Sequence, residues 1–404
     1  MIRKKASIHT PGWLAELRSQ FPVTKHWAYF DSAYETGSAY FLEKASERYF
    51  RDKSDFYPGI LQEGGSGKGA AIGLIEETRD LLAQLLNAKD GHHVAFTANT
   101  CQAVSLVLQS YPFQKGDNVV VGDIEHVCVL YPVISLKQQG VEVRLVHPEN
   151  EWSLTAESLL EQVDENTKFV VVSYVQSGSG YRIDMEKLTR ECHKKGCFVL
   201  TDAIQALGFQ KFDMQTLGVD AVAASGYKGL LSIEGGGFVC LEDRLLQKLH
   251  PYMAGPNPAL TIDRTTGTFT CKNELDSRKL EAGTLPFHTI YCLNESLKQI
   301  QRIGQDAIAD HVEQCYQAVY AGLTELGYPV DTPLEHHCHS MVVGTAKKEQ
   351  MAAFFQSKGV FLNAGHGDHV RLAVAPFTSE SDIERLLSAA EEWKLLNERQ
   401  GKSY

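Results

Sequence analysis

The sequence predicts an α/β protein built on a mainly parallel, seven-stranded sheet. Seven short apolar segments are expected to form the strands: Val94–Phe96, Asn118–Val121, Val141–Val146, Lys168–Val175, Cys197–Thr201, Ala221–Ala224 and Gly237–Leu241. Val119–Val121 and Val170–Val172 are unbroken β-branched runs, which are typical of strands buried on both faces of a parallel sheet. Amphipathic segments with helical spacing accompany the strands, as at Leu74–Leu86, Gln102–Gln109 and Met185–Lys195. This alternation of strand and helix predicts a layered α/β fold.

A second, smaller α/β unit is expected after about residue 290. Helices are expected over Asn294–Ile303, His311–Leu326 and Ser381–Leu396, and strands over Ser340–Val343 and His369–Val374. The first residues contain one predicted helix, Pro11–Arg18, which could join either unit. The predicted division is therefore an N-terminal segment (1–25), a large domain (26–285) and a small C-terminal domain (286–404).

Composition excludes several classes of protein. The 404 residues are 43% hydrophobic, which is enough for a large core, and their net charge of −11 argues against nucleic-acid binding. No apolar run approaches the roughly 18–20 residues that a membrane span needs, and no apolar segment follows the basic N-terminus as in a secretory signal. Nine scattered cysteines, an odd number, are typical of free thiols in a reducing compartment. We therefore expect a cytoplasmic, globular enzyme.

Polar residues follow the predicted strands at the points where those strands end. They are Asn99 and Thr100, His126, Gln176, Asp202 and Gln205, and finally Ser225, Tyr227 and Lys228. The carboxyl ends of parallel strands lie at one edge of a sheet, where open α/β proteins bind ligands. Asn99 or Thr100 also caps a predicted helix, and the free amides of a helix N-terminus suit a phosphate.

Each of these residues has an ordinary structural explanation when taken alone. Thr100 and Asp202 could be helix caps, His126 a hydrogen-bonded structural histidine, and Lys228 a solvated amine. Their joint occurrence at one edge fits a single cofactor, pyridoxal phosphate. Its aldehyde needs a lysine to hold it as a Schiff base, and its pyridine nitrogen needs a carboxylate beside it. Its flat ring suits an imidazole, and its phosphate suits a helix N-terminus with hydroxyl donors.

Several longer motifs resemble one known family. These are Thr97–Thr100, Glu125–His126, Thr201–Gly208, Ser225–Leu231 and Leu280–Thr284. They are similar to motifs of the class V aminotransferases of pyridoxal-phosphate fold type I, and they occur in the right order between Tyr29 and Arg371. That group includes cysteine desulfurases, selenocysteine lyases, kynureninases and isopenicillin-N epimerase-like proteins. The resemblance implies a pyridoxal-phosphate-dependent enzyme with a large domain and a smaller C-terminal domain.

The resemblance assigns roles around the cofactor ring. It makes Lys228 the Schiff-base lysine, pairs Asp202 with the pyridine nitrogen and stacks His126 on the ring. Gln205 matches the family residue near the phenolic oxygen of the cofactor, and Gln176 is a weaker candidate for the same neighbourhood. These roles agree with the chemistry that the strand ends indicate.

The resemblance also assigns the phosphate site. Thr100, Ser225 and Tyr227, beside the helix cap Asn99, would hold the phosphate. Tyr227 departs from the family pattern, because many members have histidine there, although a phenol can still donate a hydrogen bond. Thr284 resembles a residue that reaches the phosphate of the neighbouring subunit, which implies a homodimer with shared active sites.

Arg371 resembles the arginine that binds the carboxylate of an amino-acid substrate, and a structural ion pair is the alternative interpretation. Desulfurases in this family need a cysteine on the loop ahead of that arginine, but the loop here, Asn363–Val370, has none. Cys338 lies some thirty positions upstream and is expected to be buried. A transaminase, a C–S or C–Se lyase and an amino-acid epimerase all stay open. A noncatalytic binding protein on this fold is the alternative outside enzymes.

Two further motifs are discounted. Gly64–Gly69 is glycine-rich and includes a lysine, but it fits a phosphate loop poorly because no predicted strand precedes it. The three histidines and one cysteine of His336–His339 match no standard zinc spacing and lead straight into a strand, so no metal site is expected.

Overall fold

The computed structural model describes residues 9–56, 70–148, 152–365 and 367–399. The glycine-rich motif Gly64–Gly69 lies outside the described residues. No helix in the described part of the chain is long and apolar enough to cross a membrane.

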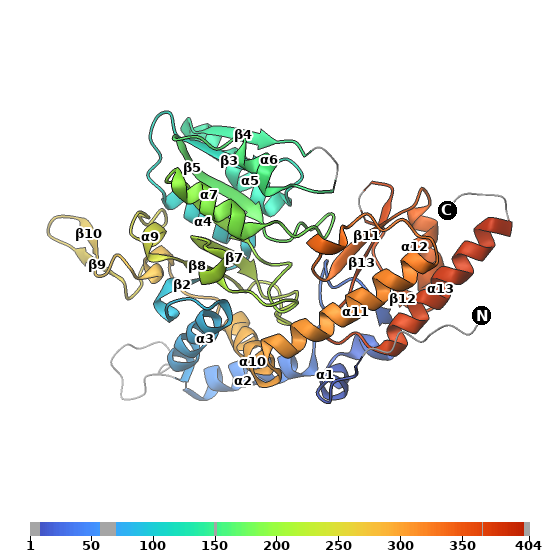
Figure 1. The fold of residues 1–404 in the computed structure, drawn as a ribbon. Helices are drawn as coiled ribbons and strands as arrows, with labels where there is room; N and C mark the ends of the chain where they lie inside the picture. The colour runs from blue at the N-terminus through green and yellow to red at the C-terminus, as the bar shows by residue number, and fades with distance from the viewer. Residues whose placement is uncertain (1–8, 57–69, 149–151, 366, 400–404) are drawn as a thin grey trace.

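The centre of the large unit is a seven-stranded sheet with the order β2-β8-β7-β6-β5-β3-β4 (Figure 1). Its strands are β2 (Val94–Thr97), β3 (Asn118–Gly122), β4 (Glu142–Val146), β5 (Thr167–Ser173), β6 (Phe198–Asp202), β7 (Ala221–Ser225) and β8 (Gly237–Leu241). Neighbouring strands are parallel except at β8, which runs antiparallel to both β2 and β7. The predicted fold, with a mainly parallel sheet of seven strands, is confirmed.

The buried strands alternate their side chains between two apolar layers. Val119 and Val121 of β3 pack in one layer with helices α4 (Thr100–Ser110) and α5 (Val127–Ser135). Val120 packs in the other layer, which contains residues of α3 (Ala70–Leu86), α7 (Met185–Lys194) and α10 (Phe287–Ile303). A β-branched run is therefore apolar at every position because both faces of its strand are covered.

The smaller unit contains the antiparallel strands β11 (Ser340–Gly344) and β13 (His369–Ala373). Three helices accompany them: α11 (Gln305–Glu325), α12 (Lys348–Ser357) and α13 (Glu380–Arg399). Figure 1 shows this unit beside the large sheet, with α11 leading from α10 into it.

The N-terminal segment packs on the small unit. Arg18 of α1 (Leu14–Gln20) forms an ion pair with Asp382 of α13 at 2.5 Å, and β1 (Ala28–Tyr29) pairs in parallel with β12 (Val360–Phe361). Of the two domains that the first helix could have joined, its contacts with α13 favour the smaller one. The division at residues 25 and 285 stays a prediction.

Six further α-helices and strands complete the described chain, and all of them except the long helix α2 are short. They are α2 (Tyr40–Phe56), α6 (Ala156–Leu160), α8 (Met214–Leu217), α9 (Asp243–Leu246), β9 (Leu260–Asp263) and β10 (Thr268–Cys271). The antiparallel pair β9–β10 extends away from the body of the molecule (Figure 1).

Candidate active site

The ends of β2 and β7 meet at the first turn of α4. The Asn99 side chain caps this helix by accepting a hydrogen bond from the Gln102 amide at 2.9 Å. The Thr100 amide donates to the Ser225 hydroxyl at 2.8 Å, and the two hydroxyls lie 3.1 Å apart. Amides at the start of an eleven-residue helix, together with two hydroxyls, can hold a phosphate.

A cavity opens beside this turn at the carboxyl ends of the strands. Its inner part, of about 40 Å³, is lined by residues that include Asn99, Thr100, His126, Asp202, Gln205, Ser225, Tyr227 and Lys228. An outer part of about 450 Å³ shares His126, Gln205, Tyr227 and Lys228 with it and reaches Arg371. The structure thus brings together most of the residues that the strand-end analysis singled out.

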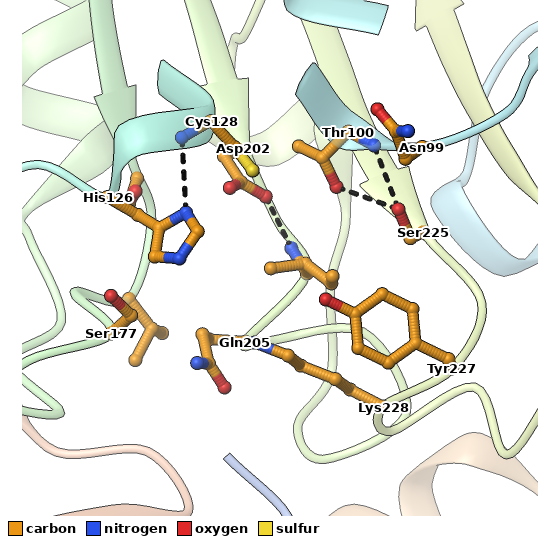
Figure 2. Close-up of a pocket in the computed structure, with 13 residues that line it drawn as sticks. Asn99, Thr100, His126, Cys128, Ser177, Asp202, Gln205, Ser225, Tyr227 and Lys228 are labelled. Atoms are coloured by element: carbon orange, nitrogen blue, oxygen red, sulfur yellow. Dashed lines mark hydrogen bonds between the residues drawn. The ribbon is translucent and has the colours of Figure 1, made fainter. Parts of the chain in front are cut away.

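Lys228 extends from the loop after β7 toward Gln205 (Figure 2). Its side chain is 7% exposed, and no group in the described chain accepts a hydrogen bond from its amine. The amine lies 5.7 Å from the centre of the Tyr227 ring. Burial lowers the pKa of Lys228 to about 8, although the Asp202 carboxylate opposes that shift. A lysine with this pKa has a substantial neutral, nucleophilic fraction near neutral pH.

Asp202 is the last residue of β6 and is buried. Its Oδ1 accepts a hydrogen bond from the Ile204 amide at 2.9 Å (Figure 2). Burial raises the pKa of Asp202 to about 6, while the Ile204 amide and the Lys228 amine hold it down. The group is therefore mainly ionised at pH 7, and a positively charged ring nitrogen beside it would favour that form further.

His126 lies immediately before α5, with its ring in the cavity. Its Nδ1 accepts a hydrogen bond from the Cys128 amide at 3.2 Å (Figure 2). The preceding Glu125 is buried and accepts from both the amide and the hydroxyl of Ser173, at 3.0 and 2.5 Å. These contacts anchor the loop and orient the imidazole where it can lie against a flat ring.

Gln205 and Gln176 differ in whether their side chains reach the cavity. The Gln205 side chain is 2% exposed; its Nε2 donates to the Ala33 carbonyl at 2.9 Å, and its Oε1 has no partner within the described chain. The Gln176 side chain instead hydrogen-bonds to the backbone of Leu154: its Oε1 accepts from the Leu154 amide at 3.3 Å, and its Nε2 donates to the Leu154 carbonyl at 3.4 Å. The structure therefore does not bring Gln176 into the cavity. Because side chains alternate along extended chain, the next residue, Ser177, lines the cavity in its place.

Thr284 also lies outside the Lys228 cavity. It lines a separate surface depression with Ala98, Gln102 and Met253, next to the first turn of α4. Thr284 is absent from the lining of the cavity that holds Lys228. Its role toward a neighbouring subunit stays a prediction.

Arg371 lies on β13 and is 8% exposed. Its Nη1 donates to the Ser177 carbonyl at 2.7 Å, its Nη2 lies 3.7 Å from Asp31 Oδ1, and its Nε has no partner in the described chain. The structural ion pair considered from sequence is thus present, but it leaves part of the guanidinium unsatisfied. Burial raises the pKa of Asp31 to about 6 despite Arg371.

Sequence reasoning missed several residues that line the cavity. They are Tyr34, Glu35, Cys128, Ser177, Glu234 and Asn363. Most lie on loops that are distant from one another in the sequence, and no predicted strand end pointed to them. Cys128 could have been found, since it follows His126 at the start of a helix.

The residues present fit pyridoxal phosphate. An anion site, a buried carboxylate, an oriented imidazole and a buried amine of lowered pKa converge on one cavity, and the unpaired Gln205 Oε1 faces it. Fold and donor set together define the class of protein: an α/β enzyme with its cofactor at the carboxyl ends of a parallel sheet.

Comparison with known proteins identifies the family. The family described as aminotransferase class-V matches residues 48–386, and the chain belongs to it. The protein is a pyridoxal-phosphate-dependent enzyme of fold type I, as the sequence motifs implied.

The relatives include probable cysteine desulfurases. A probable cysteine desulfurase of Methanothermobacter thermautotrophicus is 28% identical over 77% of this chain and 76% of its own. An uncharacterized aminotransferase of Schizosaccharomyces pombe is 30% identical over 77% of this chain and 80% of its own. The apo structure of a cysteine desulfurase from Thermococcus onnurineus superposes with a TM-score of 0.82 at 21% identity, covering 96% of this chain and 99% of its own.

Proposed function

We propose that this enzyme acts on an α-amino acid, as a lyase or a transaminase, with its cofactor held by Lys228. The observation that carries the proposal is the buried Lys228 amine, which has no hydrogen-bond partner in the described chain and shares a cavity with Asp202, His126 and Arg371. When bound, pyridoxal phosphate supplies a carbonyl carbon that condenses with amines and a ring that withdraws electrons from the substrate α-carbon.

The side chains of this enzyme divide the remaining tasks. Thr100, Ser225 and the amides of α4 hold the phosphate, and Asp202 keeps the ring nitrogen protonated. Arg371 orients the substrate carboxylate. The Lys228 amine, once free, can accept the proton of the substrate α-carbon, since a pKa of about 8 suits proton transfer near neutral pH.

Among lyases, transfer of sulfur to a loop cysteine of this chain is disfavoured. The segment 363–370 ahead of Arg371 has no cysteine, and Cys338 is buried, as expected, with its pKa raised to about 12 by burial. The cysteine that does line the cavity, Cys128, also has a pKa raised by burial, to about 11. The similarity to a probable cysteine desulfurase therefore supports C–S bond chemistry on a substrate more than it supports a protein persulfide.

Borohydride reduction tests the proposal. Treatment of the purified protein should fix the cofactor covalently, because reduction converts the imine between Lys228 and the cofactor into a stable amine. Digestion and mass spectrometry should then locate the added mass on the peptide that contains Lys228. An adduct on any other lysine would refute the assignment.

The Arg371→Lys variant should bind amino acids about ten- to a thousand-fold more weakly, because lysine cannot reproduce the two-pronged contact of a guanidinium with a carboxylate. Titration of the cofactor absorbance with amino acids measures this change. The cofactor content and resting spectrum should stay normal, and Arg302→Lys, which alters an exposed ion pair with Glu16, provides the control. Equal affinities in parent and variant would mean that another group binds the carboxylate.

We further propose a homodimer in the cytoplasm. Thr284 supports the dimer, since it lies on the surface beside the first turn of the phosphate-site helix α4 rather than in the cavity of its own chain. All nine cysteines are free, including Cys192 and Cys197, which lie close together without forming a disulfide. Free neighbouring thiols support a reducing compartment.

A further inference from the structure

The outer part of the cavity carries two carboxylates that the proposed function does not use. Glu35 is half-buried and lies on the loop between β1 and α2, while Glu234 is exposed in the turn before β8. Both line the same part of the cavity and lie close enough for their charges to interact, although they come from positions about two hundred residues apart. The fold therefore brings two acidic groups together at the mouth of the same cavity that holds Lys228 and Arg371.

This pair has no positive partner in the described chain. Burial and the nearby Glu234 carboxylate raise the pKa of Glu35, and Asp31 adds to the effect. Other carboxylates of the protein pair with cations, as Glu77 does with Lys298 at 2.8 Å. Two adjacent carboxylates repel each other unless they share a proton or a cation lies between them.

Independent observations indicate that this cavity receives a ligand. Gln205, 2% exposed, and Arg371, 8% exposed, both line it, and the side chain of each has a buried polar atom without a partner in the described chain. Arg371 offers a guanidinium for a carboxylate, and the glutamate pair adds negative charge to the lining of the same cavity. The rings of Tyr34 and Tyr227 line it as well, and aromatic rings attract cations.

We infer that the substrate is an α-amino acid with a cationic group on its side chain, which the Glu35–Glu234 pair binds while Arg371 binds the α-carboxylate. This inference rests on the proposed function and adds the chemical class of the side chain. The volume of about 450 Å³ is sufficient for an amino acid with a long side chain.

Two matched amino acids test the inference. L-Arginine and L-citrulline have nearly the same shape and differ in charge, so their affinities isolate the contribution of the cation. We expect the holoenzyme to bind arginine at least about tenfold more tightly than citrulline, as measured by titration of the cofactor absorbance and by calorimetry. The double variant Glu35→Gln, Glu234→Gln should bring the ratio close to one, because it removes the charge that distinguishes the two ligands.

Two controls keep the result interpretable. Glu349→Gln removes an exposed carboxylate of α12, far from the cavity lining, and should leave the preference intact. The single variant Glu234→Gln alters an exposed side chain and should reduce the ratio part of the way, even if the double variant fails to fold. An unchanged ratio in a folded variant would overturn the role of the glutamate pair.

Failure of the inference differs from failure of the proposed function. If the parent binds citrulline as tightly as arginine, the cationic side chain is wrong and the amino-acid enzyme stands. If cysteine, lysine, arginine, citrulline and norleucine all leave both the absorbance and the heat unchanged, the amino-acid substrate itself is wrong, and the inference falls with it.

Discussion

The Lys228→Ala variant is expected to lose covalent retention of the cofactor and to turn over about four powers of ten more slowly than the parent. Lys228 is the one lysine in the cavity lining, and its buried amine has no hydrogen-bond partner in the described chain. At its pKa of about 8, roughly one amine in ten is neutral at pH 7, far more than for an exposed lysine. The variant removes both the attachment point and the group that can accept the α-proton.

Borohydride reduction, gel filtration in denaturant and absorbance of the retained cofactor measure the first loss, and steady-state kinetics measure the second. Two further variants separate chemistry from charge. Lys228→Arg keeps a positive charge in the cavity but cannot form an imine, and it should be as inactive as the alanine variant. Lys211→Ala, at an exposed ion pair with Asp306, should behave like the parent. A Lys228→Arg protein with parental activity would exclude the covalent role.

The sheet could be predicted because its signal is local. Runs such as Val119–Val121 are apolar at every position, and only a strand covered on both faces requires that pattern over so few residues. The direction of β8 was not visible, since an antiparallel strand buried on both faces has the same composition as a parallel one. The pairing of β1 with β12 was not visible either, because it joins residues more than three hundred positions apart.

The site could be predicted where it depends on strand ends. Asp202 closes β6 and Ser225 closes β7, so adjacent strands bring both residues to one edge. The position of Gln176 failed for a local reason: β5 ends at Ser173, two residues earlier than expected, and the chain then turns so that Val175 pairs with Arg182. Because successive side chains of an extended chain point to opposite sides, an error of one residue places the wrong side chain in the cavity.

The outer wall of the cavity shows the limit of the strand-end rule. Glu35 and Glu234 lie on loops, and their proximity depends on how the segment 33–36 packs beside the cavity. The backbone of that segment is tied to the cavity at Thr36, whose amide donates to the Tyr227 carbonyl at 3.2 Å. The sequence around either glutamate does not indicate that the two residues lie close together in the fold. The residues that we infer to select the substrate could therefore not be predicted from the sequence, whereas those expected to hold the cofactor could.

The Asp202→Ala variant should retain the cofactor but remove the substrate α-proton about a thousand-fold more slowly. Asp202 lies buried at the floor of the cavity, and the Lys228 amine favours its ionised form. The Asp202 carboxylate would hold a proton on the ring nitrogen of the bound cofactor, and without it the ring would withdraw electrons less strongly. Loss of deuterium from α-deuterated amino acids, followed by mass spectrometry, reports this step directly. Asp123→Asn, just past the end of β3 in the same sheet and outside the cavity lining, should exchange at the parental rate. Parental exchange in the Asp202→Ala protein would mean that another acid pairs with the ring.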